Sequence, residues 1–284
     1  MVRMVLGVEY DGSDFFGWQW QKNGRSVQLE LEKALSAVAN EPITVQCAGR
    51  TDSGVHALEQ VVHFDTHAER DLRAWVMGVN CNLPPDVRVL WAKVAVDGFN
   101  ARYSAIARFY RYIILNRPMK SALLRSQVTW CYSPLDAEKM HEAAQHLIGS
   151  HDFSTFRAQA CQSKSPCRIM HFIDVSREQD RVIIDISANA FLHHMVRNIA
   201  GVLMTIGMGK QPVEWTRELL EIKKRACGGV TAPPFGLYLG GVYYPEVYGI
   251  AKHPIFSRLP DNCSRFEHGK PVLAESGCGE VQAG

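Results

Sequence analysis

The sequence predicts an α+β protein built from two similar lobes. Segments with strand-like alternation and segments with helical periodicity follow one another in both halves of the chain. Their order lacks the strict strand–helix–strand regularity that is typical of a doubly wound parallel sheet. The length of 284 residues and the hydrophobic content of 46% allow two cores of ordinary size. We expect lobes at residues 1–100 and 101–248, followed by a flexible tail at residues 249–284.

The first half begins with a segment, Arg3–Tyr10, in which apolar residues alternate, as expected of a half-buried strand. Glycines and aromatic residues then indicate a loop at Asp11–Gln21. Ser26 is a favourable N-cap for a helix that runs to about Val38. The remaining elements that we predict are short strands at Ile43–Ala48 and Val61–Thr66, a short helix around Leu72–Val79 and a strand at Val87–Val96.

The second half of the chain is also predicted to alternate between strands and helices. An amphipathic helix is predicted at Asp136–Ile148, with Gly149 interpreted as the residue after its C-cap. Pro212 is expected to open a later helix. The other predicted elements are strands at Ala107–Leu115 and Val128–Cys131, a hairpin of Ile173–Ser176 with Val182–Ala188, helices at Phe191–Met208 and Glu214–Lys223, and a strand at Leu237–Tyr243.

Charge is unevenly distributed, although the formal net charge is only +2. The stretch from Gly98 to Leu135 contains no acidic residue but carries six basic ones, and Phe153–Ile173 and Ile186–Val213 are also free of acid. Basic residues interleaved with aromatics indicate contact with a phosphate backbone. An ordinary solvated strand face explains the same pattern, so charge alone leaves both interpretations open.

No familiar cofactor or metal motif is found. The eight cysteines form no C-x-x-C pair, and P-loop, dinucleotide-binding and zinc-protease patterns are missing from the sequence. His193 and His194 are adjacent, so on a helix they would point about 100° apart and make poor co-ligands. We therefore expect no metal and no cofactor. With no signal peptide expected and no apolar run of membrane-spanning length, we expect no membrane association and a reducing, cytoplasmic environment.

The segment Gly49–Ala57, GRTDSGVHA, lies between two predicted strands. Glycines at both ends of its Arg-Thr-Asp-Ser core allow the backbone to bend and to approach a ligand closely. Asp52 could therefore project from a rigid edge as a reactive carboxylate. The same composition also suits a tight turn in which Asp and Ser bond to their own backbone, and the residues alone do not decide between these interpretations.

Five segments, taken together, resemble the bacterial tRNA pseudouridine synthase A family. They occur in the family's order and cover about residues 3–248. They are Gly49–Ala57; Tyr10–Gly12 with Phe16–Gln19; Phe99–Ala105 with Ala107–Tyr112; Phe191–Asn198; and Thr231–Pro233 with Gly236–Leu239.

The resemblance implies the pseudouridine synthase fold, in which two lobes with antiparallel or mixed sheets, flanked by helices, enclose a catalytic cleft. It also implies a cytoplasmic homodimer that acts without cofactor as an isomerase, an intramolecular transferase. The expected substrate is uridine at positions 38, 39 and 40 of the tRNA anticodon stem-loop. Such a uridine must be flipped out of its stem before a side chain can reach ribose C1′.

Site residues are carried over from the resemblance one by one. It makes Asp52 the catalytic carboxylate and Arg197 its ion-pair partner, which would lower the pKa of a buried carboxyl. It makes Tyr110 the residue that stacks on the flipped base, with a hydroxyl that could remove the proton at C5. Arg50, Arg108 and Arg111 are expected to contact the RNA. The resemblance leaves open whether Asp52 adds to C1′ covalently or removes a ribose proton to give a glycal.

Two other classes of protein remain as alternatives. One is a catalytically inactive RNA-binding module on the same fold. The other is a retaining glycosidase, which needs two carboxylates about 5 Å apart. Asp11 and Asp14 are the nearby candidates in the sequence for the second carboxylate beside Asp52. Of these, Asp11 is better interpreted as a turn residue.

Overall fold

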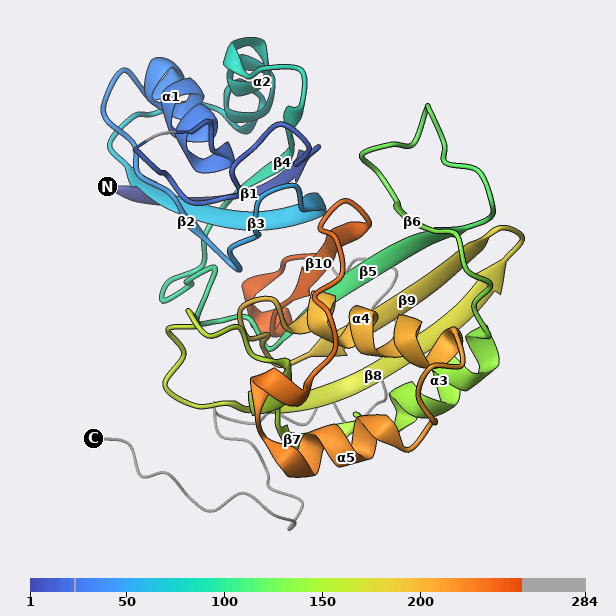
Figure 1. Cartoon of the computed structure of the whole chain (residues 1–284). Coiled ribbons are helices and arrows are strands. Elements are labelled where there is room, and N and C mark those ends of the chain that lie inside the picture. The colour runs from blue at the N-terminus through green and yellow to red at the C-terminus, as the bar shows by residue number, and fades with distance from the viewer. Residues whose placement is uncertain (23, 252–284) are drawn as a thin grey trace. The chain divides into compact units, whose positions relative to one another are not determined.

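A computed structural model describes residues 1–22 and 24–251 as two compact units (Figure 1). Of the described residues, unit 1 contains Met1–Arg111, Ala122–Thr129 and residues 234–251, and unit 2 contains Tyr112–Ser121 and Trp130–Pro233. Strands and helices in both units confirm the α+β class. The lobe boundaries at residues 100 and 248 stay predictions, and the expected flexible tail lies, from residue 252 on, outside the described residues.

Unit 1 is built on a mixed sheet whose strands follow the order β4-β1-β3-β10-β5. β1 (Val2–Tyr10) pairs antiparallel with both β3 (His56–Thr66) and β4 (Val87–Val94), whereas β10 (Leu237–Tyr243) pairs parallel with β3. The short β2 (Gln46–Cys47) pairs antiparallel with β3. Strand β5 (Ala107–Asn116) belongs to unit 1 up to Arg111. The segment Gly49–Ala57 follows β2 and runs into the first two residues of β3.

Helices of unit 1 pack together on one face of its sheet (Figure 1). Helix α1 (Val27–Ala39) begins as predicted, because the Ser26 hydroxyl accepts a hydrogen bond from the Leu29 N–H at 3.3 Å. The predicted short helix is a π-helical turn, Ala74–Gly78, that continues into α2 (Val79–Asn82). Trp75 in that turn contacts Phe64 of β3 edge-on at 5.2 Å between ring centroids.

Unit 2 has strands in the order β5-β9-β8-β7, with β6 (Thr129–Cys131) paired to β5. The predicted hairpin is confirmed and is longer than expected, since β8 (Cys167–Glu178) and β9 (Arg181–Ala188) pair antiparallel from Glu178 opposite Arg181. β7 (Gly149–Asp152) adds antiparallel to β8 and was not predicted. Three helices pack on one face of these strands (Figure 1): α3 (Ala137–Gln145), α4 (Met195–Gly207) and α5 (Trp215–Ile222).

Short one-turn helices connect these elements. They are the 3₁₀ turns at Ser154–Phe156, Arg225–Cys227 and Glu246–Tyr248.

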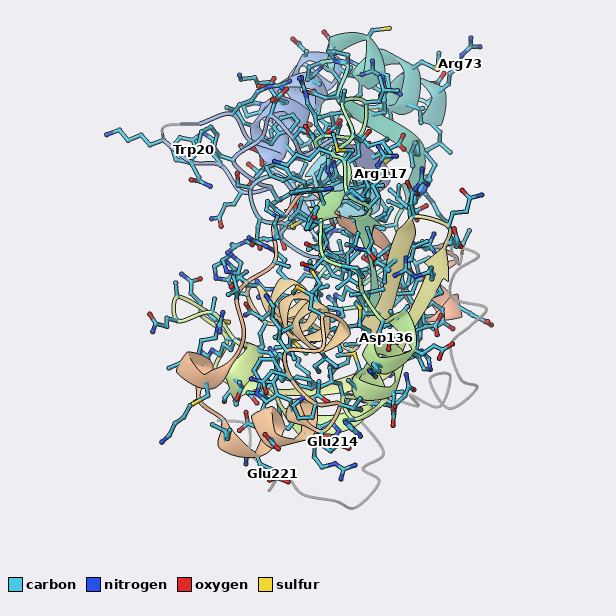
Figure 2. All side chains as sticks on the ribbon, turned by 45° about the vertical axis from the view of Figure 1, so that its right-hand side comes forward. Trp20, Arg73, Arg117, Asp136, Glu214 and Glu221 are labelled. Carbon is cyan, nitrogen blue, oxygen red and sulfur yellow. The ribbon has the colours of Figure 1, made fainter. Side chains whose placement is uncertain are left out.

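Helix ends account for most differences from the sequence prediction. Helix α3 ends at Gln145, because the following residues form single turns, and Gly149, at φ +106°, begins β7 instead of capping the helix. Helix α4 begins at Met195, four residues later than expected, because His194 has a left-handed backbone at φ 61°. The N-cap of α3 is Asp136, whose carboxylate accepts from the Lys139 N–H at 3.1 Å (Figure 2).

Across the described residues, every helix is too short or too polar to cross a membrane.

Candidate active site

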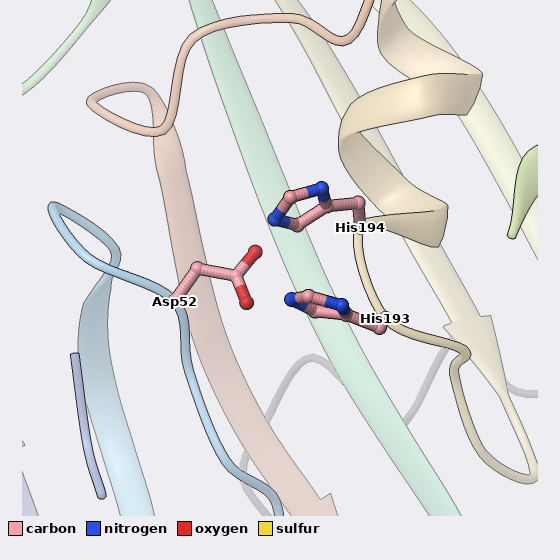
Figure 3. A group of neighbouring side chains, drawn as sticks. All are labelled: Asp52, His193 and His194. Carbon is pink, nitrogen blue, oxygen red and sulfur yellow. The ribbon is translucent and has the colours of Figure 1, made fainter. Parts of the chain in front are cut away.

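Asp52 lies half-buried on the loop that joins β2 to β3 (Figure 3). The last backbone bond of the β2–β3 pair runs from the Ala48 N–H to the Val61 carbonyl at 2.8 Å. Beyond it the chain leaves the sheet and closes a turn in which the Val55 N–H bonds to the Asp52 carbonyl at 3.2 Å. Gly54 takes φ +77° in this turn, a conformation that favours glycine. Asp52 is therefore the first residue of a defined turn.

The N-terminal aromatic loop, Asp11–Gln21, packs directly against the Asp52 loop. The Trp18 N–H donates to the Thr51 carbonyl at 3.0 Å, and the Gly54 N–H donates to the Phe15 carbonyl at 3.3 Å. A Cβ on Gly12 would lie 2.0 Å from the Val55 carbonyl oxygen, so only glycine allows this approach. The first sequence motif therefore holds the second, which explains why two glycines occur in a loop so rich in aromatics.

The aromatics of this loop divide into two kinds. Phe15 and Trp18 are each 2% exposed and form part of the core, whereas Phe16 and Trp20 are 55% and 54% exposed. Trp20 extends from the ribbon in Figure 2.

His56 holds neighbouring backbone segments together at the end of the Asp52 loop. Its Nδ1 accepts from the Gly12 N–H at 3.1 Å, and its Nε2 lies 2.8 Å from the Ser126 carbonyl and 3.1 Å from the Phe235 carbonyl. Its Nδ1 also lies 3.1 Å from the Asp11 carboxylate. The ring also stacks on Tyr238 at 4.6 Å. His56 thus joins three backbone segments of unit 1.

Asp11 is a turn residue, as predicted. Its carboxylate accepts from the Ser13 N–H at 3.0 Å. Burial opposes ionisation of this carboxyl, but the hydrogen bonds from Ser13 and nearby His56 outweigh it, so the Asp11 pKa lies below its ordinary value. Outside its own turn, the carboxylate accepts from the Gln127 Nε2 at 3.3 Å.

Tyr110 is buried within the same unit as Asp52. Its side chain is 8% exposed, and its hydroxyl faces Gly49, where an added Cβ would lie 3.9 Å from that oxygen. Burial, together with the negative charge of Asp52, raises the pKa of Tyr110 above its ordinary value. The structure therefore brings Asp52 and Tyr110 into one electrostatic environment in which the tyrosine stays a neutral phenol.

Tyr112, two residues after Tyr110 on β5, has different surroundings. Its side chain has no exposed surface, and its hydroxyl donates to the Pro233 carbonyl at 2.8 Å within unit 2.

The three arginines expected to contact RNA differ in exposure. Arg50 is exposed on the Asp52 loop, and Arg111 is half-buried on β5. The Arg108 guanidinium donates to the backbone carbonyls of Ala105, Ala48 and Arg102 at 3.0, 3.2 and 2.6 Å. Burial lowers the pKa of Arg108 from its ordinary value, though a guanidinium stays protonated in any protein. This geometry gives Arg108 a role in holding the backbone.

Arg197 lies in unit 2, in the first turn of α4, and its side chain is oriented by the segment that precedes β10. Its Nε donates to the Ala232 carbonyl at 2.8 Å, while the Ala232 N–H donates to the Arg197 carbonyl at 3.1 Å. Asn198, only 2% exposed, accepts from the Thr231 hydroxyl at 2.6 Å. A Cβ on Gly201 would lie 1.8 Å from the Val230 carbonyl oxygen, so glycine lets this segment lie against the helix.

His193 and His194 lie immediately before α4 (Figure 3). The expectation that they point about 100° apart on a helix is wrong, because neither residue is helical. Their ring centroids are 4.0 Å apart at an interplanar angle of 42°.

Sequence reasoning missed Gln60, whose side chain contacts the Asp52 loop from β3. It falls in phase with the buried Val62 and Phe64 in the alternation of that strand. A polar residue at a buried position of a strand is a signal that a hydrogen-bonding role exists, since burial without partners is costly. Which backbone it bonds to depends on a loop whose path the sequence does not specify.

A carboxylate on a doubly braced loop, beside a buried tyrosine, defines the candidate active site of an enzyme. The chain matches the profile of a family described as tRNA pseudouridine synthase over residues 7–104 and 143–245. It is similar to proteins named tRNA pseudouridine synthase A from several bacteria. That of Methylococcus capsulatus is 59% identical over 266 residues, 94% of this chain and 98% of the relative. Those of Nitrosococcus oceani and Pseudomonas aeruginosa are 59% and 56% identical, over 88% and 91% of this chain and 97% and 93% of the relatives.

This chain therefore belongs to the tRNA pseudouridine synthase family. It is an isomerase that converts uridine to pseudouridine in tRNA, which confirms the family resemblance seen in its five motifs.

Proposed function

We propose that Asp52 is the catalytic carboxylate for isomerisation of uridines 38, 39 and 40 in the tRNA anticodon stem-loop. The observation that carries this proposal is the bracing of the Asp52 loop, whose backbone is bonded on one side through Thr51 to Trp18 and on the other through Gly54 to Phe15. A turn residue that only closes a turn needs no such support. A reacting carboxylate does, because catalysis requires it to be held close to productive geometry.

The reaction rearranges bonds without net oxidation or hydrolysis. The bond from ribose C1′ to N1 breaks, the uracil turns, and a bond from C1′ to C5 forms. C5 then loses its proton to solvent, and N1 gains a proton from solvent. Asp52 acts either by adding to C1′ or by removing a ribose proton next to it. Both routes require the carboxylate to be ionised when the flipped uridine arrives.

Tyr110 stacks on the flipped base and assists at C5. Its elevated pKa keeps the phenol neutral while Asp52 is charged. C5 loses its proton only after the C1′–C5 bond has formed and Asp52 has been released. The Tyr110 oxygen then accepts the C5 proton while the phenolic proton passes to solvent. Two observations support this role of Tyr110: its pKa is raised, and it lies in the same unit as Asp52.

Arg197 is proposed as the ion-pair partner that keeps Asp52 ionised, as the family resemblance implies. A contact within unit 2 supports this role. The Arg197 Nε donates a hydrogen bond to the Ala232 carbonyl, which fixes the direction of the guanidinium. Arg50 and Arg111 are proposed to contact the RNA, and Arg108 to support RNA binding by holding the backbone near them. A homodimer in the cytoplasm, acting on tRNA without metal or cofactor, completes the proposal.

Substitution of Asp52 tests the catalytic assignment. An unmodified tRNA transcript tritiated at uridine C5 releases tritium to water when the C1′–C5 bond forms. We expect Asp52→Asn to bind this transcript with unchanged affinity and to release no tritium above background. Asp14→Asn is the matched control, because Asp14 is an exposed acid on the adjoining loop.

Each other outcome contradicts one part of the proposal. Release by Asp52→Asn at the wild-type rate would remove Asp52 from the chemistry, and loss of activity in Asp14→Asn would favour a two-carboxylate mechanism. Transcripts in which uridines 38, 39 and 40 are replaced by cytidine should release no tritium from the wild type. Release from them would place the target elsewhere in the tRNA.

A further inference from the structure

Gln60 has a buried polar side chain that hydrogen-bonds to the backbone at the start of the Asp52 loop. It lies on β3 opposite Val8 of β1 and is 0% exposed. Its Nε2 donates to the Gly49 carbonyl at 2.5 Å, and its Oε1 accepts from the Gly49 N–H at 3.4 Å. The side-chain amide therefore engages both backbone groups of Gly49, as a neighbouring strand would.

These two hydrogen bonds extend the β2–β3 pairing by one residue. The side chain of Gln60, instead of the backbone of β3, is the partner of Gly49. Cys47 pairs with Val62, and the Ala48 N–H bonds to the Val61 carbonyl at 2.8 Å. At the next position Gly49 bonds to the side chain of Gln60, which leaves the main chain able to turn out of the sheet. The loop that carries Asp52 begins there, three residues before Asp52.

The Tyr10 hydroxyl links the same network to a second point on the loop. It lies 2.7 Å from the Thr51 hydroxyl, and the nearby Gln60 side chain lowers the Tyr10 pKa against the larger effect of burial. Tyr10 is 2% exposed, and its burial raises its pKa, so the hydroxyl stays protonated. Gly49 and Thr51, which lie on either side of Arg50, are thus held by one buried group of side chains.

We propose that Gln60 is a positioning residue for the isomerisation, acting through Gly49 and, with Tyr10, through Thr51 on the location of the Asp52 carboxylate. The inference rests on the proposed catalytic role of Asp52. A displacement of about 1 Å at a reacting group can slow a reaction by as much as ~100-fold. Gln60 is 0% exposed and therefore cannot touch RNA, so its loss should slow the chemical step without weakening tRNA binding.

Gln60→Met tests this role, because methionine has similar length but cannot hold either group of Gly49. We expect its single-turnover rate of tritium release, at saturating enzyme, to fall about 10- to 100-fold. The dissociation constant for tRNA should stay within about twofold of wild type. Thr66→Val is the matched control, since Thr66 is equally buried on β3 but hydrogen-bonds to Glu41 and to the Ala68 N–H, away from the loop.

Gln60→Glu adds a readout that a merely structural role would not give. Its ionised carboxylate would oppose the Gly49 carbonyl, whereas its protonated form can donate to that carbonyl as Nε2 does. Burial raises the pKa of a carboxyl. The rate of Gln60→Glu, divided by the wild-type rate at the same pH, should therefore rise as the pH falls from 8.5 to 6, while the ratio for Gln60→Met stays flat.

Several results would overturn the inference. A folded Gln60→Met with a wild-type rate would do so, as would a rate loss matched by Thr66→Val at equal loss of thermal stability. A rate ratio for Gln60→Glu that is independent of pH would also contradict it. If Asp52→Asn is active, the catalytic assignment itself fails; if Asp52→Asn is inactive while Gln60→Met is normal, only the positioning role fails.

Discussion

At the scale of single residues, the guanidinium groups of Arg50 and Arg108 have different surroundings. Arg50 is exposed, whereas Arg108 donates to the carbonyls of Arg102 and Ala105, in one segment of unit 1, and of Ala48 in another. An arginine that binds carbonyls supports the fold, and an exposed one on the Asp52 loop is available for a phosphate.

Salt dependence of tRNA binding separates these two roles. We expect Arg50→Ala to reduce the slope of log K against log salt concentration by about 0.7–0.9, the loss of one phosphate contact. Arg108→Ala should lower the thermal stability, since hydrogen bonds made by a charged group are worth about 1.5–3 kcal/mol, and should leave the slope unchanged. Arg73→Ala, at an exposed arginine beside the π-helical turn (Figure 2), is the control. An altered slope in Arg108→Ala would show direct RNA contact instead.

At the scale of elements, the close contact of α4 with the segment before β10 orients Arg197. Gly201 makes that contact possible, because the Val230 carbonyl lies where a Cβ would be. The Ala232 carbonyl, two residues further on, accepts from the Arg197 Nε. Movement of this segment away from the helix should therefore change the direction of the arginine.

Gly201→Ala is expected to destabilise the protein by about 1–3 kcal/mol through overpacking and to lower the rate of tritium release by at least about tenfold. Gly209→Ala is the control, since an added Cβ there meets nothing within 4 Å and only the backbone, at φ +70°, opposes it. That strain should cost about 1–2 kcal/mol without loss of rate. Thermal unfolding and tritium release check both variants; equal rates in the two would contradict the link from Gly201 to Arg197.

Element prediction from the sequence succeeded where capping and alternation are local. Ser26 caps α1 as predicted, and β10 has the predicted bounds, because both depend on neighbouring residues. The start of α4 was placed too early, since the left-handed conformation of His194 is imposed by surrounding structure. β7 was not predicted because it is short and polar, and its strand conformation depends on pairing with β8.

At the scale of the whole molecule, buried tyrosines make stability depend on alkaline pH. Burial raises the pKa values of Tyr10, Tyr110 and Tyr244 well above normal, and that of Tyr238 to about 12. The unfolded chain ionises tyrosine near pH 10. The stabilisation from keeping these phenols neutral is therefore complete below about pH 10 and is lost as the pH rises through the folded-state values.

Urea unfolding between pH 8 and 11.5 should show this loss beginning near pH 10. Absorbance at 295 nm reports the same event, because the buried tyrosines should ionise together with unfolding and the exposed ones before it. Tyr110→Phe should reduce the slope of stability against pH above pH 10. If all tyrosines ionise in one step while the protein remains folded, burial does not protect them.

The sequence by itself determined the α+β class and the order of most strands and helices, because these depend on local periodicity. It also determined the family, because the family motifs are short continuous segments of sequence. It also singled out Asp52 and Tyr110. Only the tertiary structure decided what surrounds them: that Gly12 and Gly17 lie against the Asp52 loop, that Arg108 is bound to carbonyls, and that Gln60 holds Gly49. Such contacts join residues distant along the chain, and side-chain packing, which no local pattern encodes, selects them.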